Sequence, residues 1–179
     1  MSAYKYEDGL ITERLYTRFL VPDDIQPWTS FFEDKDAIQY FPWIANDTSE
    51  ERSKQWIERQ LVRYKENRYG LQALINKETK EFVGQCGLIT QDVNGTRELE
   101  VGYHIFKKYW GQGYAPEAAK AFFEYGFKHK QAPSIISIIH IDNTKSQRVA
   151  EKNGLIRENQ IRWLDMDVFV YRMNKPPTI

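Results

Sequence analysis

One segment near the middle of the chain, residues 99–119, constrains the fold more than any other. Its first part alternates between apolar and polar residues, as a half-buried strand does, with Leu99, Val101, Tyr103 and Ile105 on one side. A loop containing Gly111 and Gly113 follows, and Pro116 suits the first turn of a helix. Glycines let backbone N–H groups approach a ligand closely, and the start of a helix attracts anions. The segment therefore predicts a strand, a glycine loop and a helix that together bind the phosphates of a cofactor.

The spacing of these glycines excludes two common phosphate-binding motifs. A dinucleotide-binding fold has Gly-x-Gly-x-x-Gly directly after a strand, whereas Pro116 occupies the third glycine position here. Residues 125–130 also lack the acidic side chain that would bind a ribose. No Gly-Lys-Ser/Thr sequence is present, which excludes a P-loop.

The composition predicts one globular domain spanning residues 1–179. Its 25 basic and 25 acidic residues cancel, so neither nucleic acid nor a membrane surface is expected as a partner. The single cysteine, Cys86, has no disulfide partner in the chain, and no signal peptide or membrane span is evident. These features predict a cytoplasmic location. No metal is expected either, because His104, His129 and His140 do not fall in a cluster with metal-ligand spacing.

The pattern of apolar residues predicts an ordered series of strands and helices. Strands are expected at residues 10–20, 69–76, 82–91, 97–105, 135–141, 156–164 and 168–173, and helices after residues 22–24 and at 48–67, 116–130 and 144–153. Thr48 and Glu51 form a capping box at one helix start, and Asn94-Gly95 is a hairpin turn. The last two strands are expected to pair across residues 165–167, and residues 40–43 to form a loop.

Several segments together resemble one protein family. They are Thr12-Glu-Arg-Leu15, Pro42-Trp43, Gly84-Gln-Cys-Gly-Leu88, the glycine loop, Asn143-Thr-Lys-Ser146 and Glu151-Lys-Asn-Gly-Leu155. In this order they resemble the GNAT acetyltransferases, in particular the ribosomal-protein N-terminal (RimJ/RimL-like) branch, in which Trp110 also fits. The resemblance covers nearly the whole chain. It implies an α+β fold of three layers, with a mixed central sheet of about seven strands and helices on both faces.

The resemblance also implies where the co-substrate, acetyl-CoA, binds. Its pyrophosphate would bind backbone N–H groups of Trp110, Gly111, Gln112, Gly113, Tyr114 and Ala115. Family members splay the preceding strand from the next one, so the pantetheine arm would contact the main chain of His104, Ile105 and Phe106, opposite residues 141–143. Asn143 matches a position whose side chain bonds the pantetheine arm. It can also cap the helix that follows, and the two roles are compatible.

Two side chains match catalytic positions of the family. Acetylation of an amine needs a base for the amine proton and an acid for the thiolate. Glu100 matches the base of several relatives, where it often acts through water; the alternative is a structural glutamate beside Glu98. Many relatives protonate the thiolate with a tyrosine where this chain has Ala150, whereas the ribosomal-protein branch uses the serine that Ser146 matches. Ser146 is therefore a candidate acid beside the cofactor, or only a residue of its helix's first turn.

The predicted activity is acetyl-CoA-dependent N-acetylation by direct transfer in a ternary complex, with backbone N–H groups stabilising the oxyanion. The acceptor is a protein N-terminal α-amine or, alternatively, a small amine such as a polyamine, amino sugar or amino acid. A non-catalytic acyl-CoA-binding module is a further alternative, although the chain keeps Glu100 and Ser146. The protein is expected to be a monomer or homodimer. The aromatic residues expected to form the acceptor wall, or else to pack in the core, are Trp28, Tyr40, Phe41 and Trp43.

Overall fold

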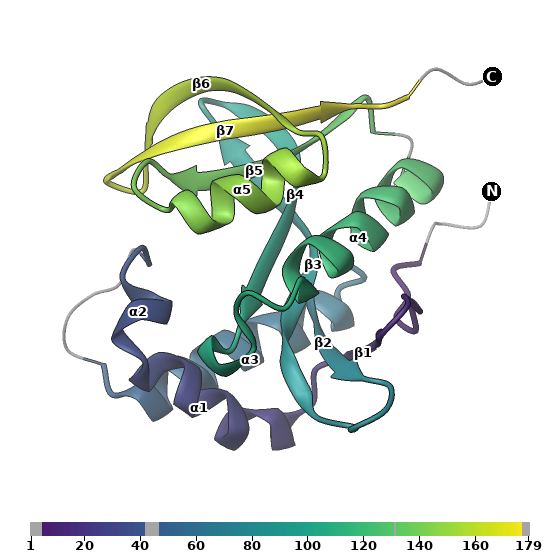
Figure 1. The fold of residues 1–179 in the computed structure, drawn as a ribbon, viewed down its shortest axis with the longest axis vertical. Coiled ribbons are helices and arrows are strands. Elements are labelled where there is room, and N and C mark those ends of the chain that lie inside the picture. The colour runs from purple at the N-terminus through teal and green to yellow at the C-terminus, as the bar shows by residue number, and fades with distance from the viewer. Residues whose placement is uncertain (1–4, 42–46, 131, 177–179) are drawn as a thin grey trace.

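The computed structural model describes residues 5–41, 47–130 and 132–176. Within these residues seven strands form one sheet in the order β1-β2-β3-β4-β5-β7-β6 (Figure 1). The strands are β1 (Leu15–Phe19), β2 (Leu71–Asn76), β3 (Phe82–Val93), β4 (Thr96–Ile105), β5 (Ser134–His140), β6 (Ile156–Trp163) and β7 (Met166–Asn174). The helices are α1 (Ile25–Glu33), α2 (Lys35–Ile38), α3 (Ser49–Lys65), α4 (Tyr114–Lys130) and α5 (Thr144–Lys152), with short 3-10 helices η1 (Pro22–Asp24) and η2 (Lys107–Tyr109).

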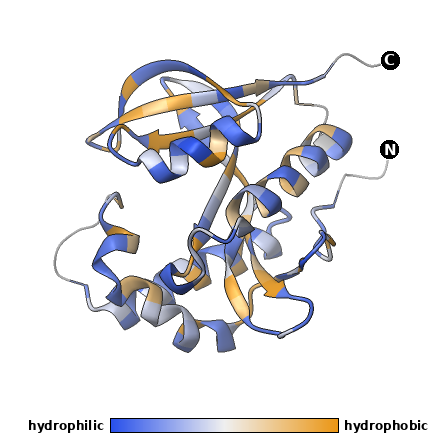
Figure 2. Ribbon diagram, in the orientation of Figure 1, coloured by the Kyte–Doolittle hydropathy of each residue, from blue (hydrophilic) through white to orange (hydrophobic). Residues whose placement is uncertain are grey.

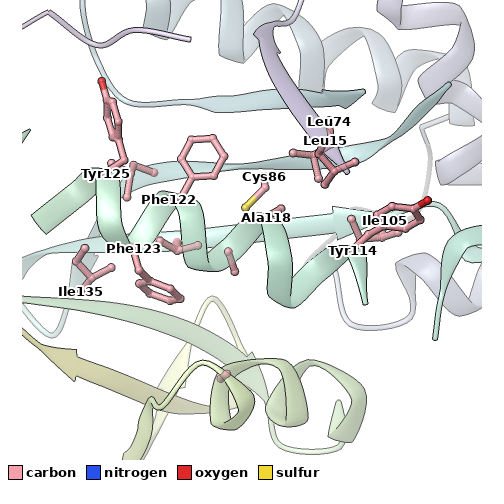
Figure 3. Close-up of a cluster of buried hydrophobic side chains, with 14 of the residues drawn as sticks. Leu15, Leu74, Cys86, Ile105, Tyr114, Ala118, Phe122, Phe123, Tyr125 and Ile135 are labelled. Carbon is pink, nitrogen blue, oxygen red and sulfur yellow. The ribbon is translucent and has the colours of Figure 1, made fainter. Parts of the chain in front are cut away.

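Helices cover both faces of the sheet, as predicted. On one face Phe122 of α4 packs in the largest core cluster together with Leu74 of β2 (Figure 3). The neighbouring residues of β2, Ala73 and Ile75, pack instead with Ile57 of α3 in a second cluster. Because successive strand residues point to opposite faces, α4 and α3 lie on opposite sides of the sheet.

The second half of the sheet carries its own hydrophobic layer. In Figure 2 strand β5 is largely orange, whereas helix α5 in front of it is mostly blue and white. Ala150 is the buried residue of α5, and it packs with Tyr171 of β7 and Ile139 of β5 in the largest core cluster. A single apolar stripe on a polar helix therefore fixes α5 against the sheet.

Strands β4 and β5 pair with each other at one point only. All other neighbouring strands are antiparallel, but β4 and β5 are parallel and share the single register pair Glu100–Ile136. The hydroxyl of Ser137 donates to the carbonyl oxygen of Val101 at 2.9 Å, just beyond this pair. After that the strands diverge, which opens the sheet between its two halves (Figure 1).

Three boundaries differ from the sequence prediction. The first strand is shorter, because residues before it fold back, with the N–H of Thr17 bound to the carbonyl of Leu10. Helix α4 begins at Tyr114 rather than at Pro116, which still lies in the first turn. The last hairpin turns at Leu164 and Asp165, whose φ angles are 45° and 61°, and not across residues 165–167. A two-residue turn of this kind matches the twist of the strands.

A short helix that the sequence pattern did not predict, α2, precedes the segment that was expected to be a loop. The side chain of Asp34 accepts hydrogen bonds from the N–H groups of Asp36 and Ala37, which caps the helix. The other turn predictions are confirmed: Val93 pairs with Thr96 across Asn94-Gly95, and the capping box of Thr48 and Glu51 is formed.

Gly87 of β3 is paired with Gly102 of β4. The packing around the two glycines predicts that substitution by alanine lowers the stability sharply at one of them and little at the other. A Cβ at Gly87 would lie 2.5 Å from the carbonyl oxygen of Gly70 and 2.8 Å from Cα of Leu71, both backbone atoms. A Cβ at Gly102 would meet only the ends of two side chains, Ile89 at 3.3 Å and Leu71 at 3.6 Å. We expect Gly87→Ala to lower the free energy of unfolding by about 1–3 kcal/mol and Gly102→Ala by less than about 1 kcal/mol. Urea denaturation measures both, and equal losses would contradict this packing.

Candidate active site

A cavity of about 980 Å³ lies where β4 and β5 separate. Its walls come from the splayed strands, the glycine loop, the start of α5, and the face of α3 that points toward the sheet. It thus connects the loop that was predicted to bind phosphate with the aromatic residues that were predicted to bind the acceptor. The residues of the sequence prediction that line it are Tyr40, Phe41, Glu100, His104, Ile105, Trp110, Gly111, Gly113, Tyr114, Ala115, Asn143 and Ser146.

The glycine loop presents free N–H groups to this cavity. Gly111 and Gly113 have φ angles of 75° and 83°, a left-handed conformation that other residues adopt only with strain. Among the described residues, no backbone acceptor binds the N–H groups of residues 111–115, whereas the N–H of Trp110 is bound to the carbonyl of Lys107. These free N–H groups lie at the start of the 17-residue helix α4, where its dipole attracts anions. Of the N–H groups predicted to bind phosphate, those of residues 111–115 are therefore without a backbone partner in the described chain, whereas that of Trp110 is already bound.

An ion pair attaches this loop to the first strand. Glu117, in the first turn of α4, accepts two hydrogen bonds from Arg14. One comes from the side-chain Nε at 2.7 Å and the other from the backbone N–H of Arg14 at 2.8 Å. Burial raises the pKa of Glu117, but hydrogen bonds from Thr12 and Arg14 outweigh it and hold the pKa below its usual value. Arg14 also donates to the carbonyl oxygen of Gln112 and lies over the ring of Tyr114. The Thr12–Leu15 segment that carried the resemblance thus fixes the shape of the loop.

The main chain of β4 faces the gap at alternate residues only. The N–H of Phe106 is bound to the carbonyl oxygen of Val83 on β3, so it points away from β5. Successive residues of a strand point their main-chain groups in opposite directions, which leaves those of Ile105 directed into the gap. The indole N–H of Trp110 donates to the Ile105 carbonyl oxygen at 2.8 Å. Of the three residues whose main chain was predicted to contact the pantetheine arm, the geometry favours Ile105. The ring of Phe106 packs on Trp28, and Phe106 does not belong to the described lining of the cavity.

The start of α5 brings together a pair of hydroxyl groups. Asn143 caps the helix, its side-chain oxygen accepting the N–H of Ser146 at 3.1 Å. The hydroxyl of Ser146 lies 3.0 Å from the hydroxyl of Tyr103, which projects from β4 across the gap. Burial raises the pKa of Tyr103, so its hydroxyl stays protonated at neutral pH. Sequence reasoning identified Ser146 but not Tyr103, because only the fold shows which strand residue reaches α5.

The carboxylate of Glu100 lies at the point where the strands separate. It is 8% exposed and accepts hydrogen bonds from the side-chain amide of Gln91 at 2.8 Å and from the backbone N–H of Ile138 at 3.2 Å. Burial raises the pKa of Glu100 above its ordinary value, although both hydrogen bonds and the charge of Arg63 act in the opposite direction. A carboxylate with a raised pKa is a better proton acceptor, and this one also holds β4 to β5.

Aromatic side chains surround the ring of His104 on the acceptor side of the cavity. The ring centroids of Phe41 and Trp56 each lie 5.1 Å from that of His104. Burial lowers the pKa of His104 to about 4, so the imidazole is neutral at pH 7. His104 therefore contributes a neutral polar side chain to this part of the wall.

The four residues predicted to form the acceptor wall have different positions. Phe41 and Tyr40 line the cavity, and the Tyr40 hydroxyl donates to the carbonyl oxygen of Asp142 on the far side of the gap. Trp28 is fully buried and stacks on Phe31 at 4.4 Å, outside the described lining. We therefore assign Trp28 to the core, because α1 turns it toward the sheet. Trp43 lies outside the described residues.

The fold and this cavity agree with the results of sequence and structure comparison. A family model described as the acetyltransferase (GNAT) domain matches residues 14–156. The chain therefore belongs to the GNAT acetyltransferase family, and it is an acetyl-CoA-dependent N-acetyltransferase of that type. YkkB of Bacillus subtilis (strain 168) is 33% identical over 167 residues, which cover 90% of this chain and 93% of that protein. The N-acetyltransferase p20 of Bacillus licheniformis is 28% identical over 176 residues, which cover 94% and 97%.

Solved structures confirm the predicted fold. A GNAT-family acetyltransferase from Bacillus anthracis has a TM-score of 0.76 and 26% identity, covering 93% of this chain and 98% of that one. RimL, a ribosomal L7/L12 α-N-protein acetyltransferase in complex with coenzyme A, has a TM-score of 0.74 and 14% identity, covering 94% and 98%. A spermidine N-acetyltransferase from Vibrio cholerae, in complex with CoA and spermine, has a TM-score of 0.72 and 16% identity, covering 90% and 96%. The last two act on different acceptors, so the fold alone does not define the acceptor.

Two further observations concern the described residues alone. No helix among them is long and apolar enough to cross a membrane. They also contain no group of three or more His, Cys, Asp or Glu side chains placed to hold a metal ion.

The free N–H groups of the loop predict a strong effect of one glycine substitution. Gly113→Glu places a carboxylate and a strained backbone where the phosphates of acetyl-CoA would bind, so we expect the dissociation constant to rise at least about tenfold. Gly95→Glu is the matched control, because Gly95 has a φ of 77° in a hairpin turn and does not belong to the described cavity lining. Isothermal titration calorimetry measures both affinities. Unchanged binding by Gly113→Glu would remove the loop from the cofactor site.

Proposed function

We propose that this protein transfers the acetyl group of acetyl-CoA directly to a primary amine in a ternary complex, with a protein N-terminal α-amine as the leading acceptor. The observation that carries this proposal is the position of Glu100. Its buried carboxylate lines the same cavity as the glycine loop and the hydroxyl pair of Tyr103 and Ser146. A proton acceptor, a proton donor and an anion site thus share one cavity, as direct acetyl transfer requires.

The residues present fit acetyl-CoA along the whole gap. The N–H groups of residues 111–115 need acceptors, and a pyrophosphate provides them. The main chain of Ile105 and the side-chain amide of Asn143 face the cavity from opposite walls, where the amides of a pantetheine arm can pair with them. Backbone N–H groups at the splayed edge would also stabilise negative charge on the thioester oxygen during transfer.

The transfer itself moves two protons in opposite directions. The lone pair of a neutral amine attacks the thioester carbonyl carbon, a C–N bond forms, and the C–S bond breaks. Glu100 accepts the proton that the nitrogen loses, directly or through a water molecule. The departing sulfur receives a proton from the hydroxyl of Ser146, and Tyr103, at 3.0 Å, returns one to Ser146. Solvent then restores the starting protonation of Glu100 and Tyr103.

Resemblance to the ribosomal-protein branch supports an α-amine acceptor. Trp110 and Ser146 match that branch. A putative ribosomal N-acetyltransferase of Bacillus subtilis (strain 168), YdaF, is 30% identical over 81 residues, 43% of this chain. An α-amine has an ordinary pKa of about 8, so one modest base is sufficient near neutral pH. A cytoplasmic location, supported by the free Cys86, would give access to newly made proteins.

An assay of thiol release tests this function directly. We expect the protein to release free CoA thiol from acetyl-CoA when given peptides with a free N-terminus, and not when the same peptides carry a blocked N-terminus. Mass spectrometry should find one added acetyl group on the peptide. Tight binding of acetyl-CoA with no thiol release for any peptide or small amine would show that the protein only binds acyl-CoA.

The pKa of Glu100 predicts the pH dependence of this reaction. The base must be ionised, and burial raises its pKa above 4.5. The value of kcat/KM should therefore fall as the pH drops through the raised pKa of Glu100, which lies above 4.5. Protonation of His104 takes place at a lower pH, near 4. Glu100→Gln should remove the fall that Glu100 contributes, leaving only the one that protonation of the acceptor amine near pH 8 produces, and should lower kcat about 100-fold or more, with the acetyl-CoA affinity unchanged. A wild-type pH profile retained by Glu100→Gln would exclude Glu100 as the base.

A further inference from the structure

Two arginines on α3, Arg59 and Arg63, line the acceptor side of the cavity. They are four residues apart, so they project from the same face of the helix. Trp56 lies one turn earlier on this face, and its ring contacts that of His104 with centroids 5.1 Å apart. Because His104 and Glu100 point to the same side of β4, the two arginines face the part of the cavity that contains the candidate base.

The guanidinium of Arg63 is held in place by a buried amide. It donates to the side-chain oxygen of Gln60 at 3.0 Å. Gln60 is 1% exposed, and the same oxygen accepts the backbone N–H of Leu71 at 3.0 Å. Arg63 is therefore positioned before any ligand binds, and a guanidinium keeps further N–H donors for one.

Neither arginine forms an ion pair with a carboxylate in the described part of the chain. The acidic side chains that line the same cavity have other partners. Asp36 pairs with Lys107, Asp47 contacts the amide of Gln55, and a carboxylate oxygen of Asp142 lies 3.8 Å from Nδ1 of His140. Glu100 is bound by Gln91 and by the N–H of Ile138.

This arrangement is electrostatically unfavourable without a ligand. Like charges four residues apart on a helix repel each other. Burial lowers the pKa of Arg63, and the positive charges of Arg59 and Arg68 lower it further, which outweighs the opposite effect of the Glu100 charge. An anion bound between them would relieve this repulsion, and guanidinium groups match the geometry of carboxylates and phosphates.

We propose that the acceptor amine carries an acidic group, a carboxylate or a phosphate, which binds Arg59 and Arg63 while the amine lies at Glu100. This inference rests on the proposed function, because it places the amine at the base of that reaction. A polycation such as spermidine would bring its charges toward the two arginines, so it is disfavoured as an acceptor. An acidic residue next to a protein N-terminus, or a small acidic amine, satisfies both ends of the site.

The test compares matched acceptors in the thiol-release assay with the full-length protein. Three peptides differ only in their second residue, which is glutamate, glutamine or lysine; free glutamate, phosphoethanolamine and spermidine complete the set. We expect kcat/KM for the best acidic acceptor to exceed that of its neutral counterpart at least about tenfold, as charge-assisted hydrogen bonds allow. Preference for the glutamate peptide or for the small acids would distinguish the two sources of the acidic group.

A double variant, Arg59→Gln with Arg63→Gln, tests the residues themselves. It should lose the preference for acidic acceptors, so that its kcat/KM values for the glutamate and glutamine peptides agree within about twofold, while its acetyl-CoA affinity stays within about twofold of wild type. The matched control is Arg68→Gln, because Arg68 follows α3, pairs with Glu66 and does not belong to the described lining. It should change neither rate nor preference. Circular dichroism confirms that the variants are folded.

Two results would overturn this inference while leaving the proposed function intact. One is a wild-type protein that prefers neither the glutamate peptide over the glutamine and lysine peptides nor the small acidic amines over spermidine. The other is a double variant that is slowed equally with every acceptor. Failure of transfer to every amine, with acetyl-CoA bound, would instead overturn the proposed function and the inference with it.

Discussion

The separation of β4 from β5 is the constraint on which the rest of the site depends. Two parallel strands that part inside a protein leave main-chain groups without sheet partners, which is costly unless other groups bind them. Part of this cost is met within the chain, because Glu100 binds the N–H of Ile138 and the Trp110 indole binds the carbonyl of Ile105. The remaining groups face the cavity, so a ligand with amides of its own is the natural partner for this gap.

Charge and packing fix the parts of the site around that gap. The Arg14–Glu117 pair ties the glycine loop to β1, and the Asn143 cap sets the direction of α5. Contacts across the gap also join its two sides: the Tyr40 ring stacks on His140, and the Lys145 ammonium lies 4.2 Å from the centroid of the Trp110 ring. The cavity therefore has walls whose side chains are already positioned, as a transfer reaction needs.

The features that the sequence predicted are those with local signals. Strand alternation, the capping box at Thr48 and the Asn94-Gly95 turn each depend on a few neighbouring residues, and the structure confirms them. The resemblance correctly predicted the gap between the strands, since that property belongs to the whole fold.

The features that the sequence did not predict arise from long-range contacts. Tyr103 meets Ser146 only because β4 passes under α5, a contact between residues 43 positions apart. The main chain of Phe106 is directed away from the gap by its bond to Val83, and Trp28 is buried by the way α1 packs. Arg59 and Arg63 look like ordinary surface arginines in the sequence until the cavity shows what they face.

Amide hydrogen exchange with and without acetyl-CoA tests the central claim most directly. If the gap and the loop together bind the co-substrate, exchange should slow at residues 111–115 and at Tyr103 and Ile105 of β4. The hairpin at Asn94-Gly95, which does not belong to the described cavity lining, should be unchanged. Saturating acetyl-CoA that leaves residues 111–115 unprotected, or that protects residues remote from the gap instead, would contradict this account of the site.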